Sequence, residues 1–146
     1  MIDVTSVREP LTLETLWDSL NDQFIALYAE ILRSTATVQW QAGHSDNQFY
    51  LMSAYASFRR VGCDDDQDLV IEVNLHRHAS TVTWTADAGQ SAGLMLADGP
   101  VMSVHESVVL SSWIGEAMDQ TTRWLKAETP NFIAYLNQEP TPYDLD

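Results

Sequence analysis

A single apolar stripe runs along the N-terminal part of the chain at helical spacing. Its members recur every three or four positions: Leu13, Leu16, Trp17, Leu20, Phe24, Leu27, Tyr28 and Ile31. The positions between them carry acidic residues such as Asp18 and Asp22. This pattern is typical of an amphipathic helix with one buried face. Thr12 stands just before the stripe and is a good N-cap residue, so the sequence predicts that the helix begins there.

The hydrophobic period then shortens to that of β-strands. Residues Thr37–Trp40 are rich in β-forming side chains, and Ala42–Asn47 is a cluster of turn-forming residues. Gln48–Phe58 predicts a long strand. Because it is apolar at nearly every position, we expect both of its faces to be covered over part of its length.

The clearest strand pattern lies in the middle of the chain. Within Leu69–His78, apolar residues alternate with polar ones, and the alternation resumes in Thr81–Asp87. A two-residue turn at Ala79–Ser80 pairs Leu75 with Trp84 and His76 with Thr83, which keeps buried and exposed faces matched. The sequence therefore predicts a hairpin with that register.

Turn signals follow this hairpin. Gly89–Gly93 reads as a turn, and Asp98–Gly99 is the best short hairpin signal in the chain. Pro100 has no amide hydrogen to donate to a sheet, which favours an edge position for its strand.

The helical period returns from Ser111 or Ser112. One apolar face is formed by Trp113, Ile114, Ala117, Met118, Thr121, Trp124 and Leu125. Thr129–Pro130 resembles a new N-cap and first-turn pair, so a separate short helix is expected after it. The ends, residues 1–10 and 137–146, predict an irregular lead-in and a loose acidic tail.

The order of elements favours one α+β domain over all 146 residues. An N-terminal helix, five or six antiparallel strands in a meander, and a C-terminal helix followed by a short final helix form two layers. The strands follow one another without intervening helices, so no doubly wound nucleotide site is expected.

Composition narrows the choice of partners. The chain has 21 acidic residues against 7 basic ones, a formal net charge of −14, which repels nucleic acids and anionic lipids and attracts basic proteins. The one cysteine, Cys63, cannot form an internal disulfide. No signal peptide and no apolar stretch of membrane-spanning length is evident, so we expect a soluble, cytoplasmic protein.

Residues Cys63–Asp68 hold four carboxylates and one thiol. Asp64, Asp66 and Asp68 match the start of an EF-hand loop, but the positions that require Gly and Glu hold Leu69 and Leu75. The segment is then a solvated turn, a surface for a basic partner, or a weak divalent-cation site. The carboxylates disfavour a thiolate at Cys63, which argues against a nucleophilic cysteine.

Polar side chains share one face of the strand Leu69–His78. Glu72 and Asn74 lie on the same side as His76 and His78. A His-x-His pair on a strand can hold a metal, but zinc needs at least three protein ligands, and nothing fixes His44 or His105 nearby. The sequence contains none of the common catalytic or nucleotide-binding motifs.

These observations favour a non-catalytic binding protein with no cofactor that neutralises a basic protein. Its size, charge and α+β character resemble those of bacterial immunity proteins, which block toxin domains. The expected contact residues are Asp64, Asp65, Asp66, Asp68, Glu72, Asn74 and His76. Two alternatives stay open: an acidic secretion chaperone, and a metal-binding or enzyme domain that uses Glu72, His76 and His78.

Overall fold

The structure, a computed structural model, describes residues 13–34, 38–45, 50–108 and 111–138. The helices are α2 (Leu13–Ser34) and α3 (Ser111–Asn137), with short 3-10 turns η1 (Asp65–Gln67) and η2 (Glu106–Val108). The strands are β1 (Val38–Ser45), β2 (Tyr50–Arg60), β3 (Leu69–His78), β4 (Thr81–Gln90) and β5 (Met95–His105). The cap expected at Thr12, the irregular lead-in, and all but the first two residues of the expected tail lie outside the described residues.

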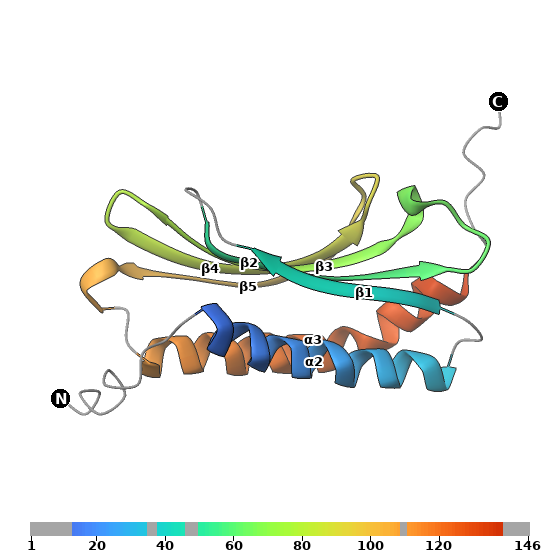
Figure 1. The fold of residues 1–146 in the computed structure, drawn as a ribbon, viewed down its shortest axis with the longest axis horizontal. Helices are drawn as coiled ribbons and strands as arrows, with labels where there is room; N and C mark the ends of the chain where they lie inside the picture. The colour runs from blue at the N-terminus through green and yellow to red at the C-terminus, as the bar shows by residue number, and fades with distance from the viewer. Residues whose placement is uncertain (1–12, 35–37, 46–49, 109–110, 139–146) are drawn as a thin grey trace.

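The five strands form one antiparallel sheet in the order β1-β2-β3-β4-β5. Both helices lie side by side against the same face of this sheet, and among the described residues no α-helix covers the opposite face (Figure 1). β3 and β4 curve away from the helices at both ends (Figure 1). The predicted α+β meander with terminal helices is confirmed. In the described part of the chain, no helix is long and apolar enough to cross a membrane.

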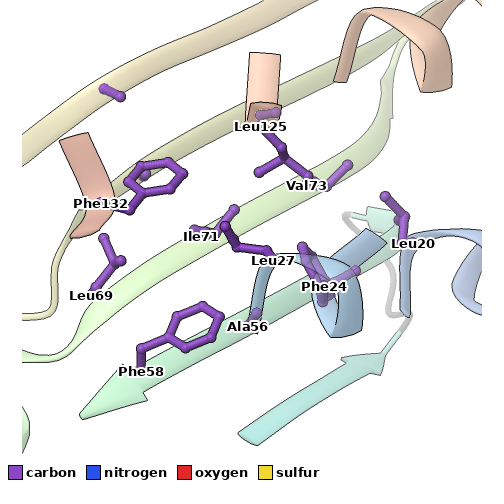
Figure 2. Packing of buried hydrophobic residues seen from close by; sticks show 14 of the residues in the cluster. Leu20, Phe24, Leu27, Ala56, Phe58, Leu69, Ile71, Val73, Leu125 and Phe132 are labelled. Carbon is purple, nitrogen blue, oxygen red and sulfur yellow. The ribbon is translucent and has the colours of Figure 1, made fainter. Parts of the chain in front are cut away.

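The core fills the space between the helices and the sheet. Figure 2 shows Phe24 and Leu27 of α2 and Phe132 of α3 in one buried cluster with Ile71 and Val73 of β3. Alternation along β3 and β4 sends every second side chain into this layer. These residues are buried because each element supplies one apolar face and the two layers cover one another.

The register predicted between β3 and β4 is confirmed. Leu75 is opposite Trp84 and His76 is opposite Thr83. The turn between the strands places Ala79 at φ 57°, in the left-handed region. Both Leu75 and Trp84 are buried, and the Trp84 Nε1 donates a hydrogen bond of 2.9 Å to Thr121 Oγ1 of α3. Trp84 is therefore held by both packing and a buried polar contact.

The hairpin turn expected at Asp98–Gly99 is wrong. These residues lie within β5, and the register shifts between the pairs Asp87–Asp98 and Thr85–Val101. Gly99 and Pro100 together stand opposite Ala86, which is a β-bulge. A Cβ at position 99 would lie 2.5 Å from the Ala86 carbonyl oxygen, so the glycine allows a close backbone approach rather than a turn. The edge position expected for Pro100 is confirmed, because β5 is the last strand.

The turn expected over Ala42–Asn47 is also wrong in its first part. β1 continues through Ser45, and Gly43 pairs with Tyr55 of β2. A Cβ on Gly43 would lie 3.0 Å from the Tyr55 ring, so the aromatic ring occupies the space that this glycine leaves open. Residues 46 and 47 lie outside the described residues.

The separate helix expected after Thr129–Pro130 is not formed. α3 is continuous to Asn137 with Pro130 inside it, and its last part, in red, runs at an angle to the rest (Figure 1). Leu125 and Phe132 are both buried, so the apolar stripe crosses the proline without a break. The Thr129 hydroxyl donates to the Leu125 carbonyl at 2.7 Å. Packing of this stripe on the sheet outweighs the local preference of proline to begin a helix.

Coverage of β2 on both faces was expected over part of its length, and it holds only near Ser57, which is buried on the face without helices. Phe58 points into the core, whereas Leu51 is exposed and Tyr55 is half-buried on the face without helices. The apolar residues of β2 therefore reflect one buried face and an open face with some apolar character.

Candidate functional site: the open sheet face

The face of the sheet away from the helices, here called the open face, is formed by alternate residues of all five strands. Its central part is polar and comes from β3, β4 and β5. The side chains that share it include Tyr55, Glu72, Asn74, His76, His78, Thr81, Thr83, Thr85, Asp87, Asp98, Val101 and Ser103. An uncovered sheet face of this kind is a surface on which a partner can lie without displacing any described element.

A row of three carboxylates crosses the middle of the open face. Glu72 of β3 is paired with Asp87 of β4, and Asp87 is paired with Asp98 of β5. Tyr55 of β2 stands on the other side of Glu72. Side chains directly opposite one another on adjacent strands lie about 5 Å apart at Cβ, so these carboxylates repel one another. We call Glu72, Asp87 and Asp98 the carboxylate row.

The central member of the row titrates abnormally. Burial raises the pKa of Asp87 above its ordinary 3.8, and the negative charges of Glu72 and Asp98 raise it further. Each of these causes disfavours the ionised carboxylate. The folded protein therefore holds Asp87 in surroundings that suit a positive neighbour or a proton.

The arginines of the described chain are engaged elsewhere. The ion pairs among the described residues join Arg33 to Glu30, Arg59 to Asp68, Arg77 to Glu106, and Arg123 to Glu116. Arg60 is buried and donates to Gln67 Oε1 and to the carbonyl oxygens of Tyr135 and Gln138. Within the described ranges, no member of the carboxylate row takes part in an ion pair.

The acidic segment Cys63–Asp68 divides into two parts. Asp64, Asp65 and Asp66 are exposed at and beside η1. Asp68 is only 7% exposed and accepts hydrogen bonds from Arg59 at 2.8 and 3.1 Å and from the Ser57 hydroxyl at 3.2 Å. Asp68 was expected to be an exposed contact residue, and this placement is wrong. It is a structural carboxylate because its charge is already neutralised inside the fold.

The same segment is held against the turn that joins β4 and β5. Ser91 N donates to the Asp68 carbonyl at 2.9 Å, and Ala92 N donates to the Asp66 carbonyl at 3.0 Å. The hydrogen bond to Asp68, followed by its charge, raises the pKa of Arg59. The exposed aspartates are thus presented from a fixed turn at one end of the sheet.

Asn74, His76 and His78 lie on the open face with Glu72, as their spacing predicts. The Asn74 Oδ1 accepts a hydrogen bond from the Ser53 hydroxyl at 2.7 Å. His78 is exposed and His76 is half-buried. In the part of the chain that the structure describes, no group of three or more His, Cys, Asp or Glu side chains is arranged to hold a metal ion.

Sequence reasoning missed two of the three carboxylates in the row, together with Tyr55. Asp87 was visible as the last polar member of the alternation in Thr81–Asp87. Asp98 was hidden because Asp98–Gly99 was interpreted as a turn. If Asp98–Gly99 is instead taken as part of a bulged strand that pairs with β4, Asp98 lies opposite Asp87 and the three carboxylates form one row across the sheet.

A second surface feature is a groove of about 790 Å³ between α2 and α3 on the side away from the sheet. Its floor includes Ala26, Leu125 and Ile133, and its rim carries Arg33 and Lys126. Both rim cations are exposed, so the groove lacks the fixed polar groups that orient a specific small ligand.

No protein-family model, curated protein or solved structure matches this chain.

Proposed function

We propose that this protein binds and neutralises a basic protein, such as a toxin domain, through the open face of its sheet. The observation that carries the proposal is the carboxylate row: Glu72, Asp87 and Asp98 stand side by side on an uncovered sheet. They have no ion-pair partner among the described residues.

Such a row opposes folding of the isolated chain. Like charges directly opposite one another destabilise a sheet, and after burial, the larger cause, the charges of Glu72 and Asp98 add to the rise in the pKa of Asp87. A guanidinium or ammonium group placed over the row removes the repulsion and gains charge-assisted hydrogen bonds. Binding of a cation from a partner therefore relieves a strain that the free protein carries.

Neighbouring side chains suit a protein partner better than a small ion. Asn74, Thr83 and Thr85 supply hydrogen-bonding groups next to the row, and Tyr55 and Val101 supply apolar area. Protein interfaces combine a central contact region of this kind with a polar rim. The open face can thus give short-range contacts that set the lifetime of a complex.

Asp64, Asp65 and Asp66 have a different role in this proposal. They lie at one end of the sheet, and Asp68 stands four residues before Glu72, roughly 13 Å along a strand. Exposed charges at that distance act before contact, by raising the rate at which a basic partner arrives. We expect them to steer the partner rather than to anchor it.

Differential capture tests the proposal. The wild-type protein, the row variant Glu72→Gln/Asp87→Asn/Asp98→Asn and the loop variant Asp64→Asn/Asp65→Asn/Asp66→Asn serve as parallel baits in extracts of the cells that produce the protein. Both variants remove three negative charges. A basic protein retained by the wild type, weakened by the loop variant and lost from the row variant supports the proposal. If every captured protein is retained equally by all three baits, the row is not a binding site.

A further inference from the structure

The two edges of the sheet are built differently. β5 carries a bulge, Pro100 and the exposed Asp98. Each of these features hinders pairing of its outer edge with another strand. β1 has none of them: residues Val38–Ser45 contain no proline and no Asp, Glu, Lys or Arg, and they pair with β2 without a register shift. One carbonyl, that of Val38, has the Tyr28 hydroxyl at 3.4 Å. Among the described residues, no other strand covers the outer edge of β1.

An exposed apolar line on α2 runs beside this edge. Ile25 is 47% exposed and Leu32 is 44% exposed. They lie seven residues apart on the helix and flank Tyr28, whose ring stacks on Trp40 of β1 at 4.9 Å between centroids. The opposite side of α2, at Gln23 and Leu27, lines the groove toward α3. Ile25 and Leu32 therefore face outward on the β1 side, and α2 and β1 both lie on the near side of the molecule in Figure 1.

The distribution of charge indicates which partner binds at the β1 edge. A basic partner is attracted to the acidic loop and the carboxylate row, whereas β1 presents no carboxylate to it. A second copy of the chain brings a charge of −14 and is repelled wherever carboxylates meet. The edge strand itself is uncharged, so its pairing with β1 of a second copy brings no carboxylates of that strand together.

We infer that the protein forms a symmetric homodimer in which β1 pairs with β1 of a second copy. The paired strands extend the sheet across a two-fold axis, and Ile25 and Leu32 of one copy pack against α2 of the other. An isologous contact of this kind buries the same surface on both copies and leaves the open face of each accessible. The dimer would thus present two acidic faces.

Sedimentation and light scattering at neutral pH test this inference. The variant Ile25→Glu/Leu32→Glu is expected to raise the dimer dissociation constant by about 30-fold or more, as removal of central apolar contacts does. The matched control is Leu94→Glu/Val61→Glu, which adds the same charge at residues that are each 59% exposed on other surfaces. It should leave most of the dimer intact. Circular dichroism and the melting temperature confirm that both variants are folded.

Two further measurements test the dimer independently of these variants. Backbone amides of β1 should exchange more slowly at high than at low protein concentration, because pairing protects the outer amides. Added salt should strengthen the dimer by screening self-repulsion, whereas it should weaken binding of a basic partner. A wild-type protein that is monomeric at about 100 µM, above the Kd expected of a weak specific dimer, would overturn the dimer and leave the proposed function standing. A dimer abolished by the control and preserved in the α2 variant would overturn it as well.

Discussion

Asp98 of β5 is the direct cross-strand partner of Asp87 of β4, and Asp87 is in turn the partner of Glu72 of β3. The pairing exists because the bulge at Gly99 shifts the register of β5 by one residue. A local backbone feature therefore determines which charges meet on the open face.

Replacing Asp87 with Asn should stabilise the isolated protein at neutral pH. The folded state raises the pKa of Asp87 above its ordinary 3.8, so the fold is most favoured while this carboxyl is protonated and loses stability as the pH rises through the raised value. The gain should be no more than about 1 kcal/mol, because solvent screens a partly exposed group. It should disappear as the pH falls below the ordinary carboxyl range.

Urea unfolding at neutral pH and at pH values near 4 measures this effect. Asp65→Asn is the matched control, since it removes the same charge from an exposed turn. An Asp87→Asn variant that is less stable than the wild type at neutral pH would show that the carboxylate has a stabilising partner.

Asp68→Asn should destabilise the fold by about 1–3 kcal/mol, the usual loss when a buried, charge-assisted contact is broken. Arg59 and Ser57 would lose the carboxylate that they bind. Asp66→Asn should change the free energy of unfolding by less than about 0.5 kcal/mol because its side chain is exposed. Equal effects of the two substitutions would place Asp68 in solvent.

Two glycine substitutions should act in opposite directions. Gly99→Ala places a Cβ 2.5 Å from the Ala86 carbonyl oxygen, so the bulge must shift and stability should fall. Gly115→Ala, in α3, meets nothing within 4 Å and should stabilise the helix by about 0.5–1 kcal/mol. Thermal unfolding of the two variants checks this, and a neutral Gly99→Ala would contradict the bulge.

Trp84→Ala should cost about 3–5 kcal/mol, because it empties a buried aromatic site between the sheet and α3. Thr121→Val keeps the shape but leaves the Trp84 Nε1 without its acceptor, which should cost about 1–3 kcal/mol. A loss below about 1 kcal/mol for Trp84→Ala, far under the usual loss for a core aromatic, would mean that the indole is exposed.

Predictions from the sequence are correct where buried and exposed residues alternate regularly. The helix α2 and the pairing of Leu75 with Trp84 follow from the positions of apolar residues alone, because a slip of one residue would expose the core face. Predictions from the sequence are wrong at Asp98–Gly99 and at Thr129–Pro130. There the local signals for a turn and for a helix start were overridden by packing of the same segments on the core.

The candidate site was predicted only in part, for the same reason. Glu72, Asn74 and His76 share the open face as expected, since they belong to one regular strand. Asp68 has the same charge as Asp66, and only its contact with Arg59 separates a structural carboxylate from an exposed one. The contact between Asp68 and Arg59 of β2 is not encoded in the local pattern of either segment.

The role of the open face is tested most directly by the binding kinetics of a captured basic partner at two ionic strengths. We expect the row variant Glu72→Gln/Asp87→Asn/Asp98→Asn to dissociate at least about 10-fold faster than the wild type, because contacts at the centre of an interface set its lifetime. We expect the loop variant Asp64→Asn/Asp65→Asn/Asp66→Asn mainly to slow association, and to do so less at high salt. A row variant whose association and dissociation rates both equal those of the wild type would contradict the assignment of the open face as the binding surface.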